Sequence, residues 1–292
     1  MKKTLLIILG AILLAGCGPG NDATDAWGNF EATEVMVSAE TGGRLLSLDV
    51  EEGARLESGR VAGWVDTIPL NLKVRQIEAQ KEAVLSRLVS ARAQADVHRE
   101  QKAVAEVELE RVRRMFDDGA ATQRQLDDAM GKIRVLDRQI DATGAEMGSI
   151  RSEARVIDAQ IAELRDRMER SAIRTPVSGT VLAKYAEAGE MAAPGKPLFK
   201  IADLETMYLR AYISGAQLAD VRLGQPVEVL FDGPDGTLDR ISGEISWIAS
   251  RGEFTPRTIQ TRDERVTTVY AIKVRVRNDG RLKIGMPGEV RF

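Results

Sequence analysis

Residues 41–59, TGGRLLSLDVEEGARLESG, and residues 177–195, VSGTVLAKYAEAGEMAAPG, share one pattern of short apolar runs separated by glycine. In both stretches three glycines recur at spacings of ten and then six residues: Gly43, Gly53 and Gly59, and Gly179, Gly189 and Gly195. Glycine at such points supplies the positive φ angles of tight turns between strands. Each copy spans about 30 residues, with too few strands to enclose a core by itself. The repeat therefore predicts two half-domains that pack against each other.

The two copies resemble the two halves of a biotinyl/lipoyl domain. The second copy is the closer match, in the run IRTPVSGTV at residues 173–181. In carrier proteins of that family the halves meet at a hairpin that presents a modified lysine. Here residues 68–171 take the place of that hairpin. The resemblance implies the fold of the domain without biotin or lipoate, and therefore without the chemistry of a swinging-arm carrier.

The inserted residues are predicted to form two long helices. Apolar side chains recur at alternating steps of three and four over residues 70–116 and again over residues 126–171, which is the pattern of a coiled-coil seam. The remaining positions are mostly charged or alanine. Each arm would extend about 70 Å at 1.5 Å per residue. We expect an antiparallel hairpin that projects far from its base.

The break between the two arms carries signals for one helix end and one helix start. Gly119 suits a helix C-terminus. Thr122, with Gln125 three residues later, has the pattern of a capping box. The turn of the hairpin is therefore predicted between residues 117 and 122.

From residue 204 onward the apolar pattern changes to a period of two. Several short predicted strands are punctuated by glycine and proline, and residues 214–221 could form one short helix that Ser214 caps. This combination favours a compact β-barrel.

The N-terminus has the pattern of an export signal. Lys2 and Lys3 precede an apolar run over residues 5–15, which is shorter than the roughly 20 residues of a membrane-spanning helix. Leu14, Ala15 and Gly16 stand directly before Cys17, which resembles a bacterial lipoprotein signal. The resemblance implies a covalent lipid on Cys17. A plain secretory peptide with a chance cysteine is the alternative.

Composition argues against several other classes. The chain has 41 basic and 44 acidic residues and no basic stretch that stands out, so a nucleic-acid partner is not expected. Its one histidine, His98, lies on the predicted seam with no cluster of ligands around it, so no metal site is expected. No nucleophile triad or phosphate-binding loop is evident. We expect a protein that is not an enzyme.

A lipoyl-like domain split by a coiled-coil hairpin resembles the HlyD-type membrane fusion proteins, the periplasmic adaptors of tripartite pumps. Hairpin tips in that family carry an arginine, a leucine four residues later and a serine seven residues after that. Arg111, Met115 and Thr122 have this spacing around the turn glycine Gly119, with methionine for leucine and threonine for serine. The resemblance implies that this tip contacts an outer-membrane channel. The alternative is that Thr122 only caps its helix and Arg111 is a solvated charge.

The same resemblance implies the other partners. Residues 254–274 are similar to adaptors that serve ABC-type exporters of the inner membrane, and the family assembles as hexamers or trimers of dimers. The chain is expected in the periplasm with its lipid in the inner membrane. That location follows from the family role, because Gly18 is not the aspartate that retains enterobacterial lipoproteins there. A coiled-coil envelope scaffold lipoprotein without a transport role is the alternative function.

These expectations describe an elongated α+β protein. Its predicted parts are a signal peptide (1–16), a linker (17–29), a first lipoyl half (30–67), a coiled-coil hairpin (68–171), a second lipoyl half (172–203) and a β-barrel (204–292).

Overall fold

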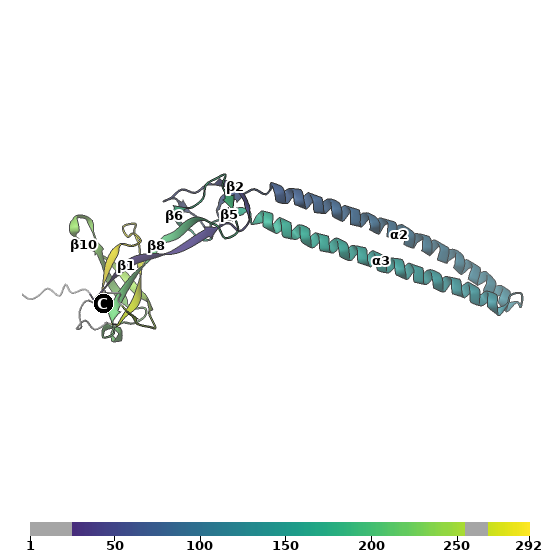
Figure 1. The fold of residues 1–292 in the computed structure, drawn as a ribbon. Helices are drawn as coiled ribbons and strands as arrows, with labels where there is room; N and C mark the ends of the chain where they lie inside the picture. The colour runs from purple at the N-terminus through teal and green to yellow at the C-terminus, as the bar shows by residue number, and fades with distance from the viewer. Residues whose placement is uncertain (1–24, 255–267) are drawn as a thin grey trace, which may run out of the picture.

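The computed structural model describes residues 25–254 and 268–292 and has three parts in a row (Figure 1). A β-barrel lies at one end, a lipoyl-like domain lies in the middle, and a two-helix hairpin forms the other end. The expected α+β class is confirmed. The signal peptide, Cys17 and most of the run at 254–265 lie outside the described residues. Within the described ranges, no helix has the length and apolarity needed to cross a membrane.

The lipoyl-like domain consists of two sheets around one core. Its second sheet has the strand order β5-β4-β2-β7, and its first sheet is the end of a larger sheet that continues into the barrel. The strands of the first sheet are part of β1 (Ala26–Ser38), part of β8 (Pro197–Ser214), β6 (Gly179–Lys184) and β3 (Arg55–Leu56); those of the second are β5 (Ala172–Arg174), β4 (Val61–Val65), β2 (Gly43–Leu48) and β7 (Met191–Ala192).

The two halves of the repeat exchange strands. Strand β2 of the first half pairs with β7 of the second, and β6 of the second half pairs with β3 of the first. The registers match as well, because Gly43 lies opposite Ala192 and Gly179 lies opposite Leu56. Each half therefore completes the other, as the repeat predicts.

The turn glycines also join the two halves. Four of them have φ between 82° and 94°, which is the left-handed region that favours glycine. Each of these four donates its backbone N–H to a carbonyl oxygen of the opposite half. The pairs are Gly53 to Val181 (2.8 Å), Gly189 to Leu45 (2.7 Å), Gly59 to Thr175 (2.8 Å) and Gly195 to Ala39 (2.9 Å).

Gly43 and Gly179 differ from the other four glycines. Both begin strands, and both sit where a side chain has no room. A Cβ atom on Gly179 would lie 2.3 Å from the carbonyl oxygen of Ala202, and one on Gly43 would lie 2.8 Å from Cγ1 of Val65. Gly43 also has the positive φ that was expected of these glycines, at 156°. The expectation of a turn conformation is therefore corrected for Gly179, whose missing side chain permits close packing between strands.

The barrel closes through six strands in the ring order β1-β8-β12-β10-β9-β13. The pairing of β12 with β8 completes the ring. Phe30 and Phe231 meet edge to face inside it, with ring centroids 6.4 Å apart. The short helix expected at 214–221 is a 3-10 turn, η1 (Gln217–Ala219). The remaining elements are β9 (Pro226–Asp232), η2 (Pro234–Gly236), β10 (Leu238–Ile248), β11 (Glu253–Phe254), β12 (Thr268–Arg277) and β13 (Pro287–Arg291).

Strands β1 and β8 run through both β domains, which moves the domain boundaries from those expected. Ala26 and Phe30 are fully buried in the barrel core, whereas Val37 on the same strand belongs to the lipoyl core. The predicted linker at 17–29 thus ends in a barrel strand. The inward-facing positions change phase between the two cores, because the pairing with β8 has an irregularity between Glu31 and Thr33. No loop or turn residue accompanies this one-residue shift, so the strand continues from one domain into the other.

The hairpin consists of α2 (Ile68–Asp117) and α3 (Gln123–Glu169). Every residue that is buried in these helices lies on a predicted seam position, so the two heptad patterns are confirmed. On α2 they are Val74, Ile77, Val84, Ala91, Ala95 and Ala105, and on α3 they are Leu136, Thr143, Ile150, Ala154, Ile157 and Ile161.

Replacing Gly189 with alanine should destabilise the lipoyl-like domain. Its φ of 94° costs an L-residue about 1–2 kcal/mol. Urea unfolding would be followed by the fluorescence of Trp64, with Trp27 and Trp247 changed to phenylalanine so that only this domain reports. The matched control is Gly148→Ala in α3, where an added Cβ meets open space and helix propensity rises by about 1 kcal/mol. Equal midpoints for Gly189→Ala and its parent would contradict the argument.

Candidate functional site

The hairpin turn is a tight helix-terminating loop. Gly119 has a φ of 72°, and an added Cβ would meet open space there, so the backbone conformation alone requires glycine. The N–H of Ala120 donates to the carbonyl oxygen of Met115 at 2.7 Å, and that of Gly119 donates to Phe116 at 3.0 Å. These bonds satisfy carbonyl groups that the end of α2 leaves free.

The start of α3 is held by a reciprocal capping box, as predicted. The N–H of Thr122 donates to Oε1 of Gln125 at 2.7 Å, and the N–H of Gln125 donates to Oγ1 of Thr122 at 3.4 Å. The Thr122 hydroxyl also donates to Gln125 Oε1 at 2.9 Å. The hydroxyl is therefore engaged in fixing the turn.

Arg111 and Met115 lie one helical turn apart at the end of α2. Nη2 of Arg111 lies 2.6 Å from a carboxylate oxygen of Glu108, and this hydrogen bond raises the pKa of Arg111 above its usual range. An exposed ion pair of this kind contributes little to stability because water screens it, so a partner's carboxylate can replace Glu108. Met115 is 42% exposed and offers an apolar contact beside the arginine.

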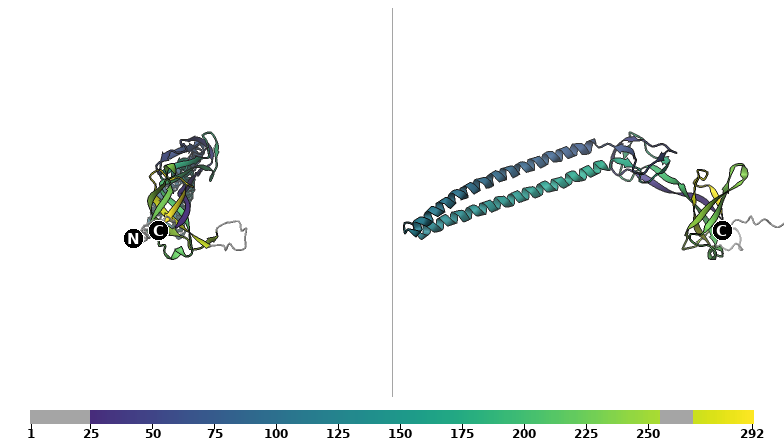
Figure 2. Two further views of the ribbon diagram at one scale, coloured as in Figure 1. Left: turned by 90° about the vertical axis from the view of Figure 1, so that its left-hand side faces the viewer. Right: turned by 180° about the vertical axis from the view of Figure 1, so that it is seen from behind.

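The structure thus places Arg111, Met115, Gly119 and Thr122 together on the last turns of the hairpin, at the end farthest from both β domains (Figure 2). Two of them, Gly119 and Thr122, shape the turn. The other two carry side chains that are free to contact a partner. The tip can bind a surface that offers a carboxylate and an apolar pocket.

Two lysines on the seam set the register between the helices. Nζ of Lys81 lies 2.7 Å from Asp158, and Nζ of Lys102 lies 2.7 Å from Asp137. The hydrogen bond to Asp137 raises the pKa of Lys102. Both lysines fall within the heptad pattern of residues 70–116, but the sequence does not identify their partners on α3, which depend on how the two helices align. A single polar residue at a seam position is known to specify register.

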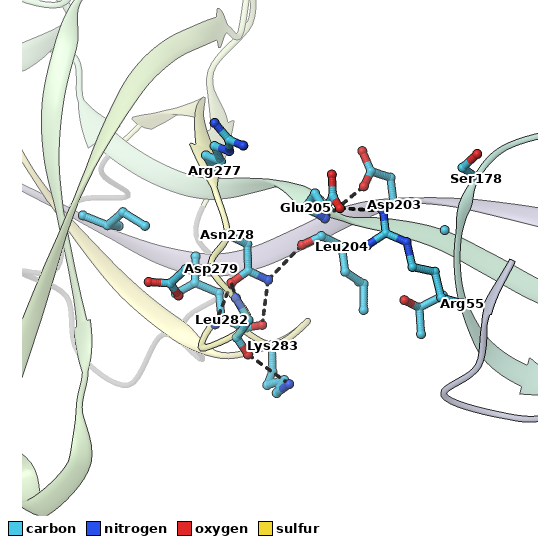
Figure 3. A pocket seen from close by; sticks show the side chains of 14 residues that line it. Arg55, Ser178, Asp203, Leu204, Glu205, Arg277, Asn278, Asp279, Leu282 and Lys283 are labelled. Atoms are coloured by element: carbon cyan, nitrogen blue, oxygen red, sulfur yellow. Dashed lines mark hydrogen bonds and ion pairs between the residues drawn. The ribbon is translucent and has the colours of Figure 1, made fainter. Parts of the chain in front are cut away.

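A cavity of about 860 Å³ lies where the two β domains meet (Figure 3). Nη2 of Arg55 in β3 lies 2.6 Å from Oε1 of Glu205 in β8. The amide nitrogen of Asn278 donates to the carbonyl oxygens of Leu204 at 2.8 Å and Leu282 at 3.2 Å. These polar groups form hydrogen bonds within the protein, so we interpret the junction as a contact between the two β domains. Sequence reasoning missed it, because Arg55 and Glu205 are 150 residues apart with no motif around either.

His98 bonds within its own helix. Its ring nitrogens lie 3.1 Å from Nε2 of Gln94 and 3.4 Å from Oε1 of Gln101. Across the part of the chain that the structure describes, no group of three His, Cys, Asp or Glu side chains is placed to hold a metal ion.

Known proteins resemble this chain in sequence and in fold. No protein-family model matches the chain. It is 26% identical over 332 aligned positions to the UPF0194 membrane protein YbhG of Salmonella typhi, covering 100% of this chain and 98% of the relative. The UPF0194 membrane protein Ent638_1286 of Enterobacter sp. (strain 638) matches with the same identity and coverage.

Two solved structures share the fold. MacA from Actinobacillus actinomycetemcomitans superposes with a TM-score of 0.63 at 20% identity, over 92% of this chain and 78% of MacA. The membrane fusion protein Spr0693 from Streptococcus pneumoniae R6 superposes with a TM-score of 0.55 at 15% identity, over 91% of this chain and 96% of Spr0693. The fold is that of the membrane fusion proteins. The candidate tip is the far end of the hairpin of α2 and α3 in this fold.

Removing the Thr122 hydroxyl should loosen the start of α3. Thr122→Ala loses the capping box, which costs about 1 kcal/mol, whereas Thr122→Ser keeps an acceptor oxygen. Hydrogen exchange of the amides of residues 125–127, the first that are hydrogen-bonded in α3, should become about five-fold faster in the alanine variant, since 1 kcal/mol changes an equilibrium by that factor. The serine variant should stay near the parent rate. Unchanged exchange in Thr122→Ala would mean that the cap does not hold the turn.

Proposed function

We propose that this chain is a periplasmic adaptor that links an inner-membrane exporter to an outer-membrane channel for efflux or secretion. The observation that carries the proposal is a two-helix arm, about 75 Å long at 1.5 Å per residue, set on a split lipoyl-like domain. An arm of this length serves to reach across a compartment. Its task is mechanical, and turnover of energy belongs to the membrane partner.

The tip supports docking to a channel. It is rigidly capped, it exposes Met115, and it carries Arg111 in an ion pair that exchanges at little cost. The proposed contact with an outer-membrane channel rests on a resemblance. Arg111, Met115 and Thr122 have a spacing similar to that of the contact residues at the hairpin tips of HlyD-type membrane fusion proteins.

The barrel end is proposed to face the exporter. An ABC-type exporter is favoured by the resemblance of residues 254–274, of which residues 255–267 lie outside the described part of the chain. The lipid proposed on Cys17 would tether this end of the molecule to the inner membrane, because β1 enters the barrel nine residues later in the chain.

The scaffold alternative would use the coiled coil in the same way. It gives no role to a lipoyl-like domain whose two halves complete each other, or to the closed barrel. The adaptor proposal uses all three parts.

A photo-crosslinking amino acid at Met115, in the full chain in living cells, should capture an outer-membrane channel. Arg111→Glu should reduce the yield about tenfold, which corresponds to ~1.4 kcal/mol of lost binding. The same crosslinker at Lys73, near the base of α2, should not capture it.

The matched charge control is Arg99→Glu. Arg99 pairs with Asp96 three residues before it, as Arg111 pairs with Glu108, but it lies about 18 Å closer to the base. Its reversal should leave capture unchanged. If the tip captures itself or peptidoglycan-associated proteins in place of a channel, the scaffold function is correct.

Cys17→Ser should abolish lipid attachment. Metabolic labelling with radioactive palmitate should mark the parent chain and leave the variant unlabelled, and the variant should move from the membrane to the soluble periplasmic fraction. Label retained in Cys17→Ser would place the lipid elsewhere, and an unlabelled parent would support a plain secretory signal.

A further inference from the structure

One end of the barrel lies where the chain enters it from the N-terminus. All six strands of the ring are antiparallel to their neighbours, so β1, β9 and β12 begin at this end and β8, β10 and β13 finish there. We call it the anchor end, because Trp27 near the start of β1 follows Cys17 by ten residues. An extended chain of that length spans at most about 35 Å. A lipid on Cys17 would therefore keep the anchor end close to a membrane surface.

Large apolar side chains are exposed around the anchor end. In order along the chain they are Trp27, Tyr212, Leu223 and Trp247, with exposed fractions of 60%, 38%, 69% and 43%. The opposite end of the barrel exposes two large aliphatic side chains, Leu238 and Ile284, but among the described residues it exposes no tryptophan or tyrosine. Single exposed apolar residues are ordinary, whereas a group of them at one end indicates a contact surface.

The four side chains are spread around the ring of strands. In the order β1-β8-β12-β10-β9-β13, two strands separate β1 from β10 in either direction, so Trp27 and Trp247 lie on opposite sides of the barrel. Tyr212 lies on β8, beside β1, and Leu223 directly precedes β9, beside β10. A partner bound to one side of the barrel would not contact both tryptophans. A flat surface that meets the end of the barrel contacts both.

A hydrogen-bonded turn keeps Leu223 in water. The N–H of Gln225 donates to the carbonyl oxygen of Arg222 at 3.2 Å, and the N–H of Arg222 donates to Oε1 of Gln225 at 2.9 Å. Gly224, with a φ of 82°, donates its N–H to the carbonyl oxygen of Ile245 in β10 at 2.8 Å. Exposure of a leucine to water is unfavourable. A turn that is fixed to the barrel and holds a leucine outward suits a side chain that is buried on binding.

Charged side chains of both signs accompany these apolar groups. Arg222 and Arg251 are exposed cations, Asp220 is an exposed carboxylate, and Glu253 pairs with Arg210 at 3.0 Å. A zwitterionic phospholipid offers a phosphate to such cations and an ammonium group to such carboxylates. Tryptophan and tyrosine concentrate at the level of the headgroups, because their rings are apolar and carry one polar N–H or O–H. The anchor end therefore has the side chains of a surface that meets a bilayer.

We propose that the anchor end of the barrel rests in the headgroup region of a zwitterionic phospholipid bilayer. Trp27, Leu223 and Trp247 reach the boundary between headgroups and acyl chains. The inference deepens the proposed function and rests on it, because the lipid on Cys17 is what brings this end to the inner membrane in the cell. A lipid attachment limits the distance to the membrane and leaves the orientation open. The exposed side chains determine which end of the barrel faces the bilayer.

Quenching of single tryptophans by spin-labelled lipid tests the proposal. Residues 17–292 would be coupled through Cys17, the only cysteine, to a maleimide phospholipid in phosphatidylcholine vesicles, so that the tether does not depend on lipidation in the cell. One tryptophan is kept at a time and the other two are changed to phenylalanine. Trp27 and Trp247 should each lose about half of their fluorescence when the vesicles carry a nitroxide next to the headgroups. Trp64, in the lipoyl-like domain, should lose none.

A tryptophan at the opposite end of the barrel is the matched control. Leu238→Trp, in a chain whose three native tryptophans are phenylalanine, places the probe at the start of β10, at a position that is 54% exposed. It should remain unquenched. Equal quenching of this probe and of Trp27 would mean that the tether alone brings the whole barrel to the lipid, which would overturn the proposal. Quenching of Trp27 without Trp247 would mean that the barrel lies on one side, and would overturn it as well.

A second measurement uses the exposed leucine. Leu223→Asp should leave the thermal unfolding of the chain unchanged, because the side chain is already in water. It should lower the quenching of Trp27 and Trp247 about twofold, since it removes apolar area from the contact. Ile284→Asp, at a position that is 40% exposed at the opposite end, should leave the quenching unchanged. Full quenching in Leu223→Asp would contradict the contact of this turn with the bilayer.

The outcome is separable from that of the proposed function. Capture of a channel at Met115, with Trp27 and Trp247 unquenched, would leave the adaptor role in place and overturn the bilayer contact. The anchor end would then be a surface for a protein partner. Quenching without channel capture would establish the bilayer contact in a protein with the scaffold function.

Discussion

The structure depends on the reciprocal hydrogen bonds between the two halves of the lipoyl-like domain. Four glycine N–H groups, each in a left-handed turn, donate to carbonyl oxygens of the opposite half, and two pairs of strands, β2 with β7 and β3 with β6, join the two halves. Without the other half, these polar groups would be unsatisfied and each sheet would lack a strand. The domain therefore cannot form until residues on both sides of the hairpin have met. The hairpin is both the insertion and the connection that brings them together.

The base of the hairpin is joined to this domain at one small set of contacts. The N–H of Val65 donates to the carbonyl oxygen of Ser171 at 2.9 Å, and the Ser171 hydroxyl lies 3.2 Å from that of Thr41. Ser171 is fully buried there. Since α2 and α3 enter the domain at adjacent points, the seam that holds them together also holds the two lipoyl halves together. Folding of the arm and of its platform should thus be coupled.

Much of this could be predicted from the sequence, for a physical reason. Periodicity and glycine spacing are local signals, and they located the seam residues, the capping box and the split domain. What the sequence did not indicate depends on contacts between distant residues: the pairing of Lys102 with Asp137, the Arg55–Glu205 contact, and the passage of β1 through two cores. Gly179 is an example within the repeat itself. A side chain at this position would collide with the carbonyl group of Ala202. No local sequence pattern distinguishes a glycine required for that reason from a glycine required by a turn.

The two continuous strands determine how the molecule can transmit force. Strands β1 and β8 pair on both sides of an irregularity between Glu31 and Thr33, and they form the only strand pair shared by the barrel and lipoyl cores among the described residues. A two-stranded ribbon bends more readily than a packed domain, and bulges are where strands bend. Asn278 and Arg55 add polar contacts on one side of this ribbon. Because the hairpin is long, a small rotation at the ribbon becomes a large displacement at the tip. A rotation of about 10° at the ribbon, over an arm of about 75 Å, moves the tip by roughly 13 Å. The direction in which the tip points is therefore set by the ribbon and not by the stiff arm.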